Sequence, residues 1–70
     1  MQVWLFEHKI QYEGTETKAI CATRARAVKA LLDYKNLLGN QGWVKSGTAE
    51  KTIWSKSDQE LQVFPYEVLE

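Results

Sequence analysis

The sequence predicts a two-layer α+β domain in which one amphipathic helix covers one face of a four-stranded, mainly antiparallel sheet. Three observations support this class. Residues 24–38 repeat apolar side chains at helical spacing, the segments on either side are rich in strand-forming residues, and a turn signal divides each of these segments in two. Because one helix lies between two pairs of strands, the expected element order is ββαββ.

The first pair of strands is predicted as a hairpin over residues 3–22. Residues 3–12 contain β-branched and aromatic side chains at both alternating sets of positions, one set with Trp4 and Phe6 and the other with Val3 and Leu5. Residues 13–16 are predicted to turn, and residues 17–22 to return as a shorter strand. The pattern leaves open which set faces the helix.

The helix is predicted to begin after Thr23 and to end before Gly39. A threonine hydroxyl can accept a hydrogen bond from a free backbone N–H at a helix start, and glycine is the usual residue just after a helix end. Arg24 and Lys35 fall within the apolar arc, but both are near a helix end. Their long stems can cover apolar surface while their charges reach solvent.

The second half of the chain is predicted to contain a long loop followed by a second hairpin. Residues 39–49 are rich in Gly, Asn, Gln and Ser around Trp43, which favours a loop. Residues 51–56 and 60–64 are predicted strands separated by a turn at 57–59. Pro65 interrupts the last strand before residues 66–69, which requires either a sheet edge or a bulge at that point.

Composition limits the class of protein. Seventy residues suit a single domain, residues 1–70, and nine Lys and Arg against nine Asp and Glu give a net charge of zero and no long-range field. The lone Cys21 excludes a disulfide scaffold and favours a cytoplasmic location. The N-terminal apolar run of four residues predicts neither export nor a membrane anchor.

No motif predicts an enzyme, a cofactor or a metal site. His8 is the only histidine and Cys21 the only thiol, so a nucleophile and base could come only from this pair, and a zinc site would lack ligands. Gly39, Gly42 and Gly47 lack the Lys-Ser/Thr ending of a phosphate-binding loop.

The aromatic content predicts an interaction surface. Three Trp, three Tyr and two Phe exceed what one helix can shield, so we expect an aromatic open sheet face that binds a partner protein or a second copy as a homodimer. The candidate anchors are Trp4, Phe6, Trp54 and Tyr66. In the alternative interpretation, Trp43 and the loop at 39–49 fold over that face and leave nothing to bind.

A second hypothesis is nucleic-acid or phosphate-ligand binding at the helix start. The first turn is basic although the helix dipole favours acids there, which makes an anion site from Thr23, Arg24, Arg26 and Lys29. The simpler interpretation is that the arginines pair with glutamates. Lysines also flank aromatic residues of the strands, but glutamates of the same strands are expected to dilute any basic track, so nucleic acid is the less favoured partner.

The chain resembles a loose set of small uncharacterised bacterial and phage proteins. The matching segments are Trp4-Leu5-Phe6-Glu7-His8, Ile20-Cys21-Ala22-Thr23-Arg24-Ala25-Arg26-Ala27 and Tyr66-Glu67-Val68. The resemblance implies the ββαββ order and a small accessory protein, one use of which would be to inhibit a host protein if the chain is phage-encoded.

Overall fold

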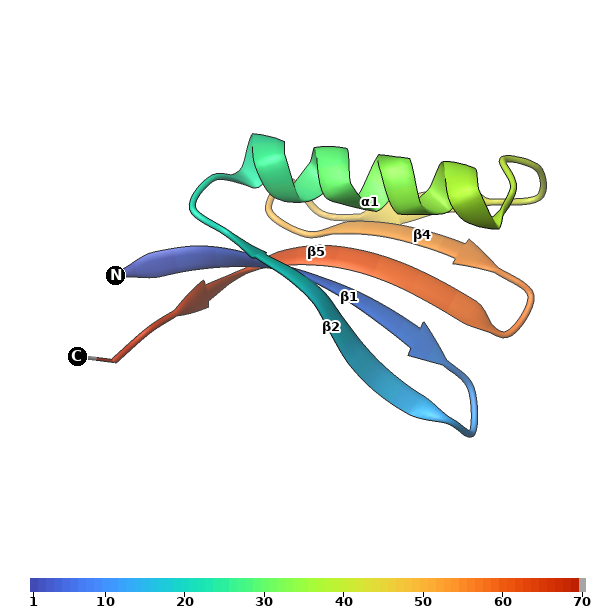
Figure 1. Cartoon of the computed structure of the whole chain (residues 1–70), viewed down its shortest axis with the longest axis horizontal. Coiled ribbons are helices and arrows are strands. Elements are labelled where there is room, and N and C mark those ends of the chain that lie inside the picture. Colours follow the sequence, from blue (N-terminus) through green and yellow to red (C-terminus); the bar gives the residue numbers. More distant parts are fainter. Residues whose placement is uncertain (70) are drawn as a thin grey trace.

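The computed structural model describes residues 1–69 and contains one helix and five strands (Figure 1). In chain order these are β1 (Gln2–Ile10), β2 (Gly14–Cys21), α1 (Arg24–Leu38), β3 (Val44–Gly47), β4 (Thr52–Lys56) and β5 (Gln59–Glu67). The strands form a single antiparallel sheet in the order β2-β1-β5-β4-β3. The predicted α+β class with one helix is therefore confirmed.

The predicted helix boundaries are confirmed. Thr23 has an extended backbone, and its hydroxyl oxygen accepts a hydrogen bond of 3.3 Å from the backbone N–H of Arg26. Gly39 has a φ of 100°, and its N–H donates to the carbonyl oxygen of Asn36 at 3.2 Å. Each end of α1 is thus closed by the residue type that its backbone conformation requires.

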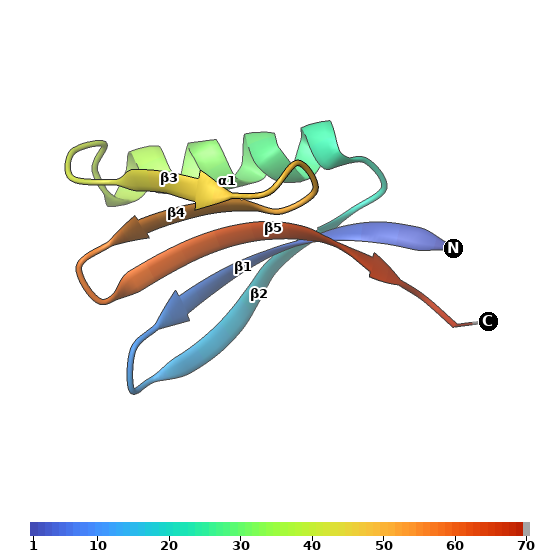
Figure 2. The ribbon, with the colours of Figure 1, turned by 180° about the vertical axis from the view of Figure 1, so that it is seen from behind.

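The helix lies across one face of the sheet and leaves the other face without a second layer (Figures 1 and 2). It packs on β5, β1 and β2. The two chain ends lie close together: the backbone N–H of Val68 donates to the carbonyl oxygen of Met1 at 2.7 Å, and the N-terminal ammonium group contacts the Glu67 carboxylate at 3.0 Å. We call the uncovered side the open face.

The prediction of four strands in the order ββαββ was wrong. Residues 39–49 were expected to form a loop, but Val44–Gly47 form a fifth strand, β3, which pairs with β4 at the sheet edge. Four residues are too few to show a clear alternation, so the pairing with β4 defines this strand. The carbonyl oxygen of Lys51 accepts from the N–H of Thr48 at 2.9 Å and holds the connection closed.

The first hairpin turns earlier than its sequence predicts. The turn occupies residues 11–13, where Tyr12 has a φ of 71° and is 97% exposed, and Gly14 already belongs to β2. The pairing slips by one residue between Phe6 and Glu7, so that Lys18 is extra on β2. This bulge lies on an edge strand, where bulges commonly discourage pairing with another chain.

Pro65 does not end the last strand. It pairs with Trp4 of β1 without any shift in register, and the pairing of β5 with β4 has already ended at Val63. On its β4 side, Pro65 therefore has no ladder to interrupt. The edge interpretation of this proline is confirmed, and β5 runs on to Glu67.

The core lies between α1 and the strands β1 and β5. Its fully buried apolar members are Phe6, Ala27, Leu31, Leu61 and Val63. Antiparallel partners share a face of the sheet, so the pairs Phe6 with Val63 and His8 with Leu61 place the even-numbered residues of β1 under the helix. The question that the sequence left open is settled by this pairing.

Candidate functional site

The open face divides into an apolar half and a polar half. Leu5 is paired with Ile20 on one side and with Phe64 on the other, and Val3 is paired with Tyr66 in the next row. Together with Ile53 of β4, these side chains form the apolar half: Val3, Leu5, Ile20, Ile53, Phe64 and Tyr66. Ile20 is 68% exposed and Tyr66 is 54% exposed, and the other four are half-buried.

This surface differs in composition from the one expected. Phe6 is buried, and Trp4 and Trp54 pack against the core on the helix side. Of the four predicted anchors, the structure places only Tyr66 on the open face. The expectation of large uncovered side chains stands, but they are mostly aliphatic, because the even-numbered set of β1 is the one that meets α1.

Trp43 does not cover the open face either. Its ring packs at the edge of the core on the helix side, and its Nε1 donates to the carbonyl oxygen of Gly39 at 2.7 Å. The segment that was expected to fold across the sheet instead extends the sheet as β3. No described helix or strand lies over the apolar half, although the Lys51 ammonium group lies 5.7 Å from the centroid of the Phe64 ring.

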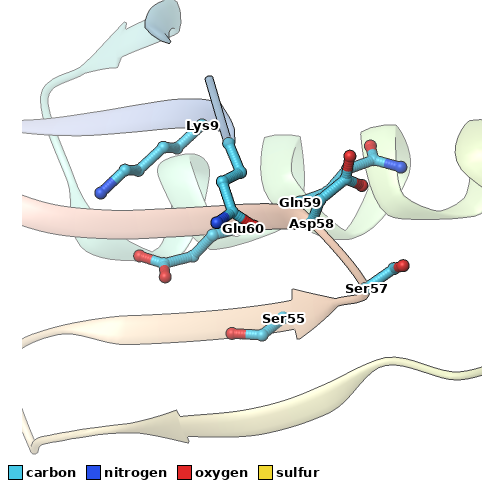
Figure 3. Close-up of a pocket in the computed structure, with 7 residues that line it drawn as sticks. Lys9, Ser55, Ser57, Asp58, Gln59 and Glu60 are labelled. Atoms are coloured by element: carbon cyan, nitrogen blue, oxygen red, sulfur yellow. The ribbon is translucent and has the colours of Figure 1, made fainter. Parts of the chain in front are cut away.

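The polar half contains an open depression of about 410 Å³ near the two hairpin turns (Figure 3). Lys9, Glu60 and Ser55 project from three adjacent strands, and beside them lie Asp58 of the turn and Gln59 at the start of β5. Both signs of charge and several neutral polar groups line it. A surface of this kind is typical of a solvated region, so we assign it no ligand.

His8 is a buried polar group on the helix side of the sheet. Its Nδ1 lies 3.1 Å from the Tyr34 hydroxyl and its Nε2 lies 3.0 Å from Oε1 of Gln59. Because an amide oxygen only accepts, Nε2 donates to Gln59, and in the neutral ring with this tautomer Nδ1 accepts from the Tyr34 hydroxyl. Both ring nitrogens are satisfied within the fold, which indicates a structural role for this histidine.

The candidate nucleophile and base are not brought together. Cys21 is paired with Trp4, whereas His8 lies four residues further along β1, roughly 13 Å away. Among the described residues, no group of three or more His, Cys, Asp and Glu side chains could hold a metal ion. The arrangement therefore gives no support to the His8–Cys21 hypothesis.

The residues at the helix start are largely engaged within the molecule. The Thr23 hydroxyl caps the helix, Arg24 Nη2 donates to the Thr52 hydroxyl at 3.0 Å, and Lys29 Nζ contacts the Asp33 carboxylate at 2.9 Å. Within residues 1–69 neither arginine pairs with a glutamate, contrary to the simpler interpretation. Three of the four candidate groups nevertheless have internal partners, which weakens the case for an anion site here.

The net charge of zero conceals two oppositely charged parts of the chain. Residues 22–57 contain seven Lys and Arg and two Asp and Glu, while the remaining residues, including Glu70 outside the described range, contain two and seven. The first part, which forms α1, β3 and β4, has a formal charge of +5, and the second, which forms β1, β2 and β5, has −5. Most of the glutamates that were expected to dilute the basic residues therefore lie outside the part of the chain that forms α1, β3 and β4.

Comparisons with protein families, with curated proteins and with solved structures return no match. The resemblance to small bacterial and phage proteins stays a prediction. Within residues 1–69, no helix has the length and apolar character needed to cross a membrane. The functional argument accordingly depends on the surfaces described above.

The sequence contains a signal for the apolar half that a count of aromatic residues overlooks. In β1 the odd-numbered set includes Glu7 and Lys9, whereas the even-numbered set has no charged residue up to Ile10. The set without charges is the better candidate for the buried side. That difference points to Leu5 on the open face and, through cross-strand pairing, to Phe64.

Proposed function

We propose that the chain is a non-catalytic protein-binding module that forms a homodimer through the apolar half of its open face. The observation that supports this proposal is the contiguous group of six apolar side chains on four adjacent strands, with no described layer over it. Exposed apolar patches of this kind commonly mark interfaces. Tyr66 is of a residue type that is enriched among binding hot spots, and Phe64 of one that is enriched in interface cores.

The area available fits a second copy. A standard interface takes about 800 Å² from each partner, and the molecule exposes 4843 Å² in total. About one sixth of the surface is therefore needed, a share that one broad face of a two-layer molecule can supply. In a two-fold arrangement, apolar halves meet each other while the charged side chains Glu7, Lys9 and Glu60 stay at the rim in water.

The charge and the stability of the chain both favour a second copy as the partner of the open face. Two copies with zero net charge do not repel each other at long range. The apolar core is also small, with five fully buried members among residues 1–69, so a second layer on the open face would add burial that one helix cannot provide. Both arguments apply to a second copy without any additional assumption about a partner.

Sedimentation across a concentration series tests this proposal. We expect the mass to rise from one chain to two, and Ile20→Lys and Tyr66→Lys each to raise the dimer dissociation constant by at least about tenfold. Both residues are largely exposed in the monomer, so the fold should survive the change. Far-UV circular dichroism verifies that it does.

Leu37→Lys is the matched control, because Leu37 is 83% exposed on α1, away from the open face. It should leave the dissociation constant unchanged. A chain that stays monomeric at every concentration overturns the proposal, and so does an equal weakening by the Leu37 variant. If the chain is monomeric and a different protein binds the face that contains Tyr66, that protein is the partner of the apolar half. This result would also contradict the homodimer.

A further inference from the structure

A second surface is formed on the helix side of the sheet by side chains from the end of α1, from β4, and from β3 and the residue before it. Three lysines surround two tryptophan rings there. Lys35 Nζ lies 4.7 Å and Lys45 Nζ 5.9 Å from the centroid of the Trp54 ring, and Lys56 Nζ lies 5.7 Å from the Trp43 ring. These five residues are called the lysine–tryptophan cluster.

The three ammonium groups of the cluster have no carboxylate partner among residues 1–69. The ion pairs within that range involve the N-terminus, Lys18 and Lys29. Lys18 shows the contrast: its hydrogen bond of 3.0 Å to Glu16 raises the pKa of its ammonium group above the ordinary value. Lys35 instead donates to the neutral amide oxygen of Asn40 at 2.9 Å.

Two ammonium groups near one ring are each attracted by the ring face but repel each other, and a bound anion would offset that repulsion. Lys35 comes from α1 and Lys45 from β3, where it is paired directly with Trp54, so both are delivered to the same ring by the fold. The surrounding part of the chain, residues 22–57, has a formal charge of +5. An anionic ligand would therefore be attracted here although the whole molecule is neutral.

The tryptophan rings narrow the class of anion. Both rings are partly exposed, and Trp43 is held in place by its hydrogen bond to the carbonyl oxygen of Gly39. Ammonium groups interleaved with aromatic rings are the combination that binds single-stranded nucleic acid, because lysines contact phosphates while bases stack on the rings. A free phosphate has no planar base that could stack on the rings, and the carboxylate side chains of an acidic peptide have none either.

We propose that the lysine–tryptophan cluster binds single-stranded nucleic acid. The site is separate from the helix start and from the open face, so it does not depend on the proposed homodimer. On binding, the lysines leave the ring faces and turn to the phosphates, and bases take their place against Trp43 and Trp54. The edge position of β3 leaves room for a strand of nucleic acid to pass along that side of the sheet.

Fluorescence anisotropy with a labelled oligothymidylate tests the proposal, with tryptophan emission recorded in parallel. We expect binding at low ionic strength together with quenched tryptophan emission. If three phosphates are contacted, affinity should fall about twentyfold between about 50 and about 200 mM salt. Lys45→Gln and Lys56→Gln should each lower the steepness of that salt dependence by about one phosphate contact.

Lys9→Gln is the matched control, because it removes the same charge from the polar half of the open face. It should leave binding unchanged, and so should Tyr66→Lys, which separates this site from the homodimer. Three results would overturn the proposal: no binding at low salt, an equal effect of the Lys9 variant, or heparin bound as tightly as the oligonucleotide with tryptophan emission unchanged. Circular dichroism of each variant excludes loss of the fold.

Discussion

The two phenylalanines of the chain lie on opposite faces of the same sheet. Phe6 is 2% exposed beneath α1, and its ring meets the Tyr34 ring edge-on at a centroid distance of 5.6 Å. Phe64 pairs with Leu5 on the open face and is only half-buried. The residue type is the same, and the presence of a helix distinguishes the two environments.

The helix, rather than the amount of apolar side chain, decides which face becomes the core. Both faces present apolar groups on β1 and β5, but a single fifteen-residue helix reaches only one of them. The covered face therefore determines whether one chain folds. In the proposed homodimer, the open face is the surface through which two chains associate.

Truncating the buried phenylalanine, Phe6, gives the largest expected effect, and the same change at Phe64 is its comparison. Phe6→Ala should lower the free energy of unfolding by about 3–5 kcal/mol, because it leaves a cavity under α1. A domain of this size has a total stability of only about 3–10 kcal/mol, so most of its margin would be lost. Chemical denaturation monitored by tryptophan emission measures the change.

Phe64→Ala should cost the monomer less, about 1–2 kcal/mol, because that ring is only partly buried and has no helix over it. At low protein concentration the chain is monomeric, so the unfolding free energies of the two variants compare the contributions of the two faces to the monomer. Equal losses from both would show that the open face is part of the monomer core and that the two environments do not differ.

Gly47→Ala probes the edge of the sheet that both faces share. Gly47 has a φ of 113°, and a Cβ at this position would overlap the backbone carbonyl oxygen of Lys51. We expect a loss of about 2–3 kcal/mol, concentrated in β3, because both the backbone conformation and the space exclude a side chain. Compared with the unmodified chain, the variant should show a larger increase in hydrogen exchange in β3 than in β1.

Gly14→Ala is the control for the Gly47 variant. Gly14 also has a positive φ, 105°, but nothing lies within 4 Å of its would-be Cβ. Its replacement should cost only the strain, about 1 kcal/mol. If both glycine variants lost the same stability, the close approach of Lys51 to Gly47 would have no energetic effect.

The elements with strong local signals were predictable, and the element defined by its partner was not. Helix α1 has Thr23, Gly39 and an apolar period between them, and its boundaries agree with the prediction. Strand β3 has four residues and no period, so its existence depends on β4, which lies beyond it in the sequence. Local pattern cannot describe a strand of that kind.

The interaction surfaces were harder to predict than the fold. Aromatic residues were expected outside because of their number, yet Trp4 and Phe6 are on the helix side and the open face is mainly aliphatic. The lysine–tryptophan cluster joins α1, β3 and β4, and β3 was not predicted. The charge asymmetry of the chain, however, can be found in the sequence when charges are counted segment by segment. The net charge of zero hides it.

Tyr34→Phe tests the polar network around His8 on the covered face. The change keeps the ring but removes the hydroxyl that donates to Nδ1 of His8. A buried acceptor without its partner costs about 1–2 kcal/mol, which thermal denaturation would detect. Tyr66→Phe on the open face is the control: its hydroxyl has no hydrogen bond within residues 1–69, so its loss should leave stability unchanged. A neutral Tyr34 variant would indicate that water replaces the hydroxyl.

Ser57→Gly gives the smallest expected effect, and it touches neither face. Ser57 occupies the first central position of the two-residue turn between β4 and β5 with a φ of 54°, where glycine is the preferred residue. Relief of about 1–2 kcal/mol of backbone strain is partly offset by the greater freedom of glycine in the unfolded chain, which leaves a gain of about 0.5 kcal/mol. The thermal midpoint should rise by about 2–4 °C. Because the dimer dissociation constant should not change, this variant separates the stability of the monomer from its association; a shift in both would mean that the two are coupled through the turn.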